Sequence, residues 1–600
     1  MINEKDNSIQ PCISEEPGIQ TERPANESRK DGKAKRRLSE EEVLEYAGQL
    51  GSEKPVFLLD GRYFRRKGDA VHLLTNFRIE PVELIYAEDE AEMTADFITA
   101  SGNSHRITLL TTEFSSSQKF KSVLNRKTIS LAWFGSDSDL EILKTYLSEM
   151  SWPSRVGVKA TGIHRYEGQY VFVGSGMAVD ELGAPVNGII QLDRYKAIES
   201  DILTAAHITA DGLIQVGKLL LTYNEPAKTV AIMAWCSGCF LKQHFRSLDI
   251  KFPHLFLIGE AGSGKSTTLE SVILPIFSID RVQAATQITS FTLMKQAASS
   301  NAIPLCMDEL KPSKMDKGRL NALYNHFRDA YDGHNGVRGK PDQSVAVYRL
   351  EAPIVTAGEE SADEAAIRER SIELLFTKKD LNDTEHRDTF RHICMCSDLL
   401  RSFGRTLLSE ALGTTDEDVA KWHKEAVKQF SAEMPGRVIN NLACCYAGLR
   451  LIERMCFRFS LTWDEVFPIP PDECVKALGF GAEEYLLDGG THNRSIVEQT
   501  FEIMARMNLV YGEDYSISLG GDELFIRISH IYDRYTRYRR DFAIEGEVLT
   551  YAQFRKQLRH SDLLIATNAQ KRLRSGNTKG YIINYRLLKE RADVEGFENY

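Results

Sequence analysis

The stretch LFLIGEAGSGKSTTLESVILPIF, residues 255–277, places a glycine-rich turn between an apolar strand-like run and a helix-like run. Its residues Gly259-x4-Gly264-Lys265-Ser266 fit the phosphate-loop pattern in the strand–turn–helix context that the pattern requires. Glycines there let backbone N–H groups converge on phosphate oxygens at the positive end of a helix. We therefore predict a binding site for ATP and Mg²⁺, formed by Gly259, Glu260, Ala261, Gly262, Ser263, Gly264, Lys265, Ser266 and Thr267. In this site Lys265 reaches the β- and γ-phosphates and Ser266 is a metal ligand.

A second part of the site follows in IPLCMDEL, residues 303–310. An apolar run, 303–307, predicts a buried strand whose tip carries Asp308 and Glu309. The distance from Lys265 leaves room for a helix, a strand and a helix between the two motifs. We assign Asp308 to the metal and Glu309 to the attacking water, which predicts hydrolysis of a nucleoside triphosphate.

Composition is that of an ordinary globular protein, with 600 residues, 42% hydrophobic, 26% charged and a net charge of -11. Nucleic-acid contact must therefore come from local basic patches. The ten cysteines are sparse and mostly lie in apolar surroundings, so we expect free, buried thiols, and Cys236 and Cys239 have no partner pair with zinc spacing. No apolar run is long enough to cross a membrane, which favours a cytoplasmic, nucleoid-associated protein.

The pattern along the chain predicts five parts. Residues 1–37 are polar and predict a disordered tail ending in a basic cluster. A helix capped by Ser39 and Glu42 then leads into alternating short runs that continue to Phe134. The predicted parts are the tail (1–37), an N-terminal β-rich module with possible DNA binding (38–155), a connecting β module (156–225), an α/β ATPase domain (226–466) and a C-terminal helical and winged-helix domain (467–600).

The phosphate loop, the MDEL strand, EAPIVTAGEES and RERSIELLF, in this order, resemble the AAA+ core of ring helicases. The order is similar to that of superfamily 3 viral helicases and MCM helicases, and most similar to MCM-like replication helicases of bacterial mobile elements such as staphylococcal cassette chromosomes and pathogenicity islands. The resemblance covers roughly residues 80–465 and implies a hexameric ring that separates DNA strands during replication of a mobile genetic element. It also implies a replication initiator, primase or polymerase as a possible further partner.

The resemblance also implies roles for single residues. Strand 354–359 lies where the sensor 1 strand belongs, but Gly358 stands where related helicases have asparagine, so Thr356 or Glu359 would have to replace it. Arg370, with Arg368 as competitor, matches the arginine finger, and Arg437 matches the sensor 2 arginine. Either arginine could instead be a surface residue in an ion pair. A guanidinium supplied by a neighbouring subunit stabilises the charge of the transition state.

Three basic segments could contact DNA. NGVRGKPDQ predicts a β-hairpin with Arg338 and Lys340 near its tip, where the resemblance implies a channel loop, although an exposed charged turn would look the same. Residues 534–579 hold eleven Lys and Arg against four Asp and Glu. Residues 549–588 predict a helix, a second helix after Ser561 and a hairpin over 570–585, and the helix 551–560 with this hairpin is typical of a winged helix, with Arg572, Arg574 and Lys579 on the wing. In YFRRKGD, Tyr63 and Phe64 beside basic residues suit base stacking, although one of the two rings should belong to the core.

The leading interpretation is an ATP-driven DNA helicase. The alternative is an origin-binding initiator in which ATP controls assembly on DNA without unwinding. An ATPase that remodels proteins is disfavoured, because the chain lacks an aromatic pore loop and has a basic hairpin tip. Residues 1–225 show no clear acid constellation of a primase.

Overall fold

The computed structural model describes residues 39–50, 54–339, 345–362, 364–381, 383–430, 434–487, 496–542, 544, 550–574 and 576–597. The predicted tail, 1–37, and the predicted hairpin residue Lys340 lie outside these ranges. The chain forms two compact units. The first contains the residues up to Val82 and Thr94–Ser151, and the second contains Glu83–Met93 and the chain from Trp152 onward.

The described residues of the first unit combine strands with three α-helices. Its first helix begins as predicted, because the Ser39 hydroxyl accepts a hydrogen bond from Glu42 N and the Glu42 carboxylate accepts one from Ser39 N. The elements are α1 (Glu40–Gln49), β1 (Val56–Leu59), β2 (Arg62–Lys67), β3 (Ala70–Leu73), β4 (Phe77–Tyr86), β5 (Ala91–Thr99), β6 (Ser104–Leu110), α2 (Ser117–Lys127) and α3 (Asp137–Ser148). Strands β4 and β5 begin or end in the second unit. The β-rich prediction up to Phe134 missed α2, whose buried Phe120, Val123 and Leu124 have helical spacing.

Strand β2 contributes to the core of the first unit rather than to a stacking surface. Tyr63 is fully buried, and Phe64 is 8% exposed and stacks on Phe57 with ring centroids 5.7 Å apart. Arg65 forms an ion pair with Asp139. Both aromatic rings, not one, therefore belong to the core, and neither is available for base stacking.

The connecting module consists of short strands joined to the ATPase domain by a buried asparagine. Its strands are β7 (Ser154–Val158), β8 (Gly162–Tyr166), β9 (Gln169–Val173), β10 (Ala178–Val179) and β11 (Ile189–Gln191). Asn301 Oδ1 accepts a hydrogen bond from Ile163 N, and Asn301 Nδ2 donates one to Ile163 O, each at 2.8 Å. A Cβ at Gly162 would lie 1.9 Å from Asn301 Oδ1, so this close approach requires glycine. Asn301 lies just before the strand of the acid pair.

The ATPase domain contains the predicted parallel sheet, in the order β13-β14-β17-β12-β18. The five strands are β12 (His254–Gly259), β13 (Gln283–Ala284), β14 (Leu305–Leu310), β17 (Ile354–Gly358) and β18 (Ser371–Phe376). Side chains of β12, β17 and β18 are nearly all buried, as expected for a sheet covered on both faces. The sheet confirms the α/β class and places the ends of β12, β14 and β17 on one edge, because all its strands are parallel.

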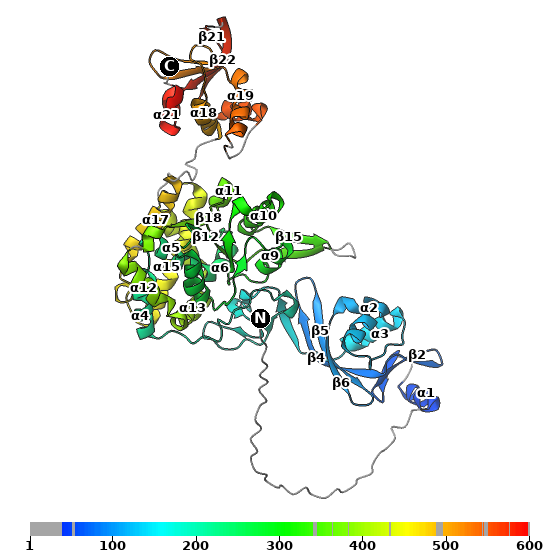
Figure 1. Ribbon diagram of the computed structural model, residues 1–600. Helices are drawn as coiled ribbons and strands as arrows, with labels where there is room; N and C mark the ends of the chain where they lie inside the picture. The colour runs from blue at the N-terminus through cyan, green and yellow to red at the C-terminus, as the bar shows by residue number, and fades with distance from the viewer. Residues whose placement is uncertain are drawn as a thin grey trace, which may run out of the picture. The chain divides into compact units, whose positions relative to one another are not determined.

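Helices surround this sheet (Figure 1). They are α4 (Ala210–Leu220), α5 (Pro226–Phe240), α6 (Lys242–Ser247), α7 (Lys265–Thr268), α8 (Leu274–Ile276), α9 (Ser290–Ala297), α10 (Lys317–Asp332), α11 (Ala365–Arg368), α12 (Thr384–Cys394), α13 (Ser397–Leu412), α14 (Asp416–Val427), α15 (Gly436–Arg458), α16 (Trp463–Val466) and α17 (Pro471–Leu487). The hairpin β15 (Asn335–Gly339) and β16 (Val345–Arg349) extends away from the body of the domain (Figure 1).

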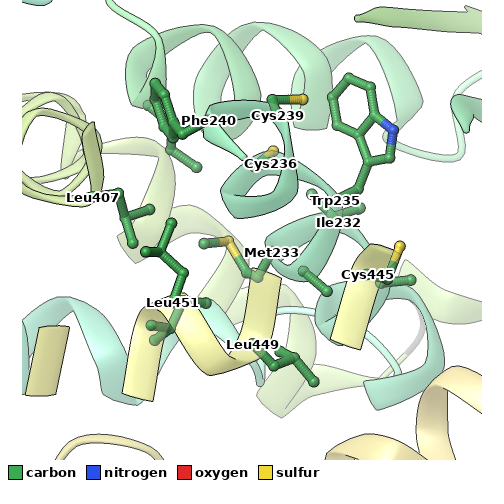
Figure 2. Packing of buried hydrophobic residues seen from close by; sticks show 14 of the residues in the cluster. Ile232, Met233, Trp235, Cys236, Cys239, Phe240, Leu407, Cys445, Leu449 and Leu451 are labelled. Atoms are coloured by element: carbon green, nitrogen blue, oxygen red, sulfur yellow. The ribbon is translucent and has the colours of Figure 1, made fainter. Parts of the chain in front are cut away.

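Helix α5 forms the centre of the helical core. Thirteen of its fifteen residues are buried, so it is apolar on all sides, and it packs against α15. Figure 2 shows Met233 of α5 near Leu451 of α15. Burial raises the pKa of the Cys445 thiol to about 12, which keeps this thiol protonated and unreactive at neutral pH. The Cys236–Cys239 pair thus lies in packed apolar helix, as the sequence indicated.

The C-terminal part forms a small α/β domain with its own core. Its elements are α18 (Ile496–Arg506), β19 (Tyr515–Ile517), β20 (Glu523–Ile526), α19 (Ile528–Asp541), α20 (Tyr551–His560), β21 (Leu564–Leu573), β22 (Gly576–Asn584) and α21 (Tyr585–Arg591), with strand order β19-β20-β22-β21. The expected second helix after Ser561 is wrong, because Leu564–Leu573 pairs with β22 as a long antiparallel strand. Among the helices of the described residues, none has the length and apolar character needed to cross a bilayer.

Candidate active site and nucleic-acid interface

The phosphate loop leaves the end of β12 and enters α7 through a left-handed glycine. Gly264 has φ 94° and is the residue before the first helical turn. Gly259 has φ 131°, and a Cβ there would lie 2.0 Å from the Phe376 carbonyl oxygen, so a side chain does not fit. A π-helical turn, Leu269–Ile273, continues α7. The loop therefore has the tight backbone that a phosphate cradle needs.

Lys265 points back into this loop. Its Nζ donates hydrogen bonds to Gly259 O at 2.9 Å and to Glu260 O at 2.6 Å, and its side chain is only 7% exposed. Burial lowers the pKa of Lys265, and the nearby carboxylates of Glu359 and Asp308 partly offset that effect. The lysine thus occupies the loop that a phosphate chain would fill, held by carbonyl oxygens that phosphate oxygens can replace.

The acid pair lies at the end of β14, on the same edge of the sheet. Glu309 adopts φ 61°, and its N–H donates to Asp308 Oδ1 at 2.7 Å. The register between β14 and β17 shifts between Met307 and Leu310, so the two acids sit on a bulge. A non-glycine residue in this conformation costs about 1–3 kcal/mol and is typical of functional sites. The bulge turns Glu309 out of the buried strand, and it is exposed.

The residues at this edge suit ATP with a bound Mg²⁺. Magnesium usually takes one or two carboxylates together with phosphate oxygens and water. Ser266 and Asp308 could supply the serine and carboxylate donors of such a site, and Lys265 could supply the cation. Within the described residues no cluster of three or more His, Cys, Asp or Glu forms a metal site independent of a nucleotide.

Strand β17 lies between the phosphate-loop strand and the acid-pair strand. Thr356 pairs in register with Phe256 and Met307, inside the sheet, and is 1% exposed. Its hydroxyl oxygen has no hydrogen-bond partner among the described residues. Glu359, the alternative at this position, directly follows the last residue of the strand and pairs with Lys311. The structure therefore brings Glu359, and not Thr356, to the edge where the phosphate loop lies.

Arg370 and Arg437 lie at the opposite edge of the sheet. Arg370 immediately precedes β18, and its carbonyl accepts a hydrogen bond from His254 N at the start of β12. The six residues of β12 then span about 17 Å to Gly259, at roughly 3.3 Å per residue. Arg370 is buried and its Nη2 lies 2.9 Å from Asp332 Oδ2, while Arg437 Nη1 lies 2.8 Å from Glu369 Oε2. Both arginines are thus in ion pairs away from the phosphate loop of their own chain.

The predicted hairpin is present as an antiparallel pair, with Arg338 opposite Ala346. Arg338 is exposed, and its guanidinium lies 4.0 Å from the ring centroid of Phe291 on α9. At the base of the hairpin, Arg349 forms an ion pair with Glu88. Sequence reasoning missed Phe291, because a single aromatic residue in a helical pattern carries no signal before the hairpin is placed beside it.

The basic residues of the C-terminal hairpin lie on β21, on β22 and, for Arg574, in the turn directly after β21. Arg572, Arg574 and Lys579 are exposed, and Arg572 pairs in register with Asn577 while Lys579 pairs with Gln570. Helix α20 buries Phe554 and Leu558 and leaves a basic face. This face carries Arg555, Lys556 and Arg559, of which Lys556 and Arg559 are exposed and Arg555 is partly exposed.

Comparison with solved structures finds proteins of similar fold. The structure described as the active helicase Cch of SCCmec type IV matches with a TM-score of 0.53 and 14% identity, over 90% of this chain and 99% of that one. The C-terminal region of NrS-1 (TM-score 0.27, 8% identity, 63% and 87% coverage) and the JCV helicase (0.18, 18%, 38% and 60%) are also found. No protein-family model and no curated protein matches the sequence. The chain thus shares the fold of a solved helicase across nearly its whole length.

Proposed function

We propose that this protein is an ATP-dependent DNA helicase that assembles into a ring and moves DNA past hairpin β15–β16. The observation that carries the proposal is the connectivity of one sheet. The hairpin is inserted between β14, which carries the acid pair, and β17, the strand next to the phosphate loop. If hydrolysis moves the end of β14, the movement would reach the hairpin through α10. If it moves β17, the movement would reach the hairpin directly, because β16 precedes β17 in the chain. The fold shared with a solved helicase supports this function.

The place of the arginines supports assembly into a ring. With Arg370 and Arg437 at the edge opposite the phosphate loop, neither can act on ATP in its own chain without a large rearrangement. A neighbouring subunit that presents this edge to the loop would bring them to the γ-phosphate. We therefore propose a hexameric AAA+ ring, with replication of a mobile genetic element as its role and a replication initiator, primase or polymerase as a further partner. Such a protein would work in the cytoplasm, on nucleoid DNA.

For ATP hydrolysis the protein has mainly to position the reacting groups and to stabilise the charge on the phosphate oxygens. Lys265 holds the β- and γ-phosphates, and Ser266 and Asp308 would hold Mg²⁺, which neutralises phosphate charge when bound. Glu309, turned outward by the bulge, orients the attacking water. Arg370 of a second copy would stabilise the charge that develops on the γ-phosphate oxygens.

The test is substitution of Lys265. We expect Lys265→Ala to abolish ATP hydrolysis and strand separation on a forked duplex, while binding of single-stranded DNA remains. A matched control is Lys317→Ala, at the exposed start of α10. Unwinding by Lys265→Ala at the rate of the unchanged protein would refute the proposal.

A second candidate function, binding to a specific origin without unwinding, is favoured by the C-terminal domain. Apart from the short strand β19, the chain order α18, β20, α19, α20, β21, β22 matches that of a winged helix, with α20 as the candidate recognition helix and β21–β22 as the wing. Substitution of Arg572, Arg574 and Lys579 by alanine should lower duplex affinity and reduce its salt dependence. A protein that binds native origin duplex tightly but never separates strands would support this second function.

A further inference from the structure

Two side chains at the phosphate edge form a pair that the sequence did not reveal, although Glu359 was itself a candidate for the sensor 1 position. Lys311 follows the last residue of β14, and Glu359 follows the last residue of β17. Because Leu310 and Gly358 are paired in register, the two side chains emerge side by side. Lys311 Nζ lies 2.8 Å from Glu359 Oε1, and the side chains are 24% and 39% exposed.

This ion pair lies next to the phosphate loop. Ala357 pairs in register with Leu257, so Glu359 stands two residues beyond Ala357 just as Gly259 stands two residues beyond Leu257. Glu359 is the strongest charged influence on the pKa of Lys265 after burial, and Glu309 also acts on Lys311. Both lysines and the acid pair therefore share one small volume at the edge of the sheet.

Charge explains why the pair matters there. Asp308 and Glu309 have roles with metal and water, but a third carboxylate beside a triphosphate would repel it. Lys311 neutralises Glu359 while no nucleotide is bound. An ammonium group is a compact cation on a flexible stem, so Lys311 can exchange the carboxylate for a phosphate oxygen without movement of the backbone.

We propose that Lys311 is a second cationic contact to the terminal phosphate of ATP, and that Glu359 is the positioning residue that holds Lys311 at this edge when no nucleotide is bound. This inference rests on the proposed function as an ATPase. Only a triphosphate carries the phosphate that Lys311 would contact. The exchange therefore makes the site prefer ATP over ADP and signals the triphosphate state to β14 and β17, the strands that flank the hairpin.

The experiment is calorimetric titration of the full chain with ATP and with ADP, each with Mg²⁺. Lys311→Met should weaken ATP binding about ten-fold, equivalent to 1.4 kcal/mol, and leave ADP binding unchanged. Lys311→Arg should restore most of the preference for ATP. The matched control is Lys314→Met, since Lys314 is exposed and acts on the same Glu359 through space.

The role of Glu359 is tested by a double-mutant cycle. If Glu359 acts through Lys311, the effect of Glu359→Gln on ATP affinity should differ between the unchanged and the Lys311→Met background. Equal effects in both backgrounds would overturn the pairing. Thermal unfolding of each variant shows that the fold is kept.

Failure of this inference is distinguishable from failure of the proposed function. If the unchanged protein binds neither nucleotide, the ATPase proposal fails. If the unchanged protein binds and hydrolyses ATP but Lys311→Met keeps the full preference for ATP over ADP, Lys311 does not contact the terminal phosphate. In that case only this inference is wrong.

Discussion

The contacts of Lys265 suit the phosphate-binding role that we propose for it. Its ammonium group is bonded to two carbonyl oxygens of the loop, at 2.9 and 2.6 Å, and to no carboxylate within salt-bridge distance in the described residues. Neutral acceptors of this kind are weaker partners than charged phosphate oxygens. A triphosphate that enters the loop can therefore displace them, whereas an ion pair with a carboxylate would have to be broken first.

Glu309 should be needed for hydrolysis but not for binding. We expect Glu309→Gln to bind ATP as tightly as the unchanged protein and to lower kcat by about 10²-fold or more, as loss of a group that activates water does. Titration calorimetry and steady-state ATPase assays measure the two quantities. Glu360→Gln, at the same edge, is the matched control. A kcat that survives in Glu309→Gln would show that another group activates the water.

Glu373 should make the stability of the ATPase domain depend on pH. It lies on β18 opposite Phe256 and is 7% exposed, with the Ser361 hydroxyl and Arg368 nearby. Burial raises its pKa from 4.5 to about 7. A raised pKa means that the folded state holds the proton more tightly, so this contribution is present below pH 4.5 and is lost as the pH rises through 7.

The loss amounts to roughly 3 kcal/mol of unfolding free energy if the whole shift persists. Urea unfolding at several values between pH 5 and 8 should show this fall in the unchanged protein and a flatter profile in Glu373→Gln. Glu417→Gln, on the exposed surface of α14, is the control. Identical profiles for Glu373→Gln and the unchanged protein would contradict the argument.

At the scale of elements, the sequence predicted what local pattern determines. The phosphate loop, β14, the hairpin and the capped α1 each depend on neighbouring residues, and each is found where expected. Residues 564–569, the part of β21 before the predicted hairpin, were mistaken for a helix, because their strand state depends on β22, which follows later in the chain. The edge at which Arg370 lies could not be predicted either, since it follows from the register of parallel strands rather than from any local spacing.

The hairpin should couple DNA to hydrolysis. Arg338→Ala should leave basal ATPase activity unchanged and remove most of its stimulation by single-stranded DNA. It should also lower the slope of log affinity against log salt by about 0.7 for each DNA phosphate that the variant no longer neutralises. ATPase assays and fluorescence anisotropy at several salt concentrations measure these effects.

Arg391→Ala, on the exposed surface of α12, is the control for the hairpin and should change neither quantity. Undiminished stimulation in Arg338→Ala would place the DNA-binding surface elsewhere. The neighbouring Phe291, over which Arg338 lies, would then be the next residue to test.

At the scale of the whole molecule, the two halves of the proposed active site lie at opposite edges of one sheet. One edge of the sheet has the phosphate loop, the acid pair and the Lys311–Glu359 pair. The other edge has Arg370 and Arg437 in ion pairs with Asp332 and Glu369. If the arginine edge of one copy met the phosphate-loop edge of the next, the site would be complete. Arg370 and Arg437 would then bind phosphate oxygens in place of the carboxylates of Asp332 and Glu369.

Mixing of two inactive variants tests this account most directly. Lys265→Ala keeps Arg370 but cannot bind the phosphates, and Arg370→Ala keeps the phosphate loop but lacks the arginine. Circular dichroism confirms that each variant is folded before the two are combined. If hydrolysis takes place between copies, ATPase activity absent from either variant alone should appear in the mixture. No activity at any mixing ratio, with both variants folded and associated, would contradict the account.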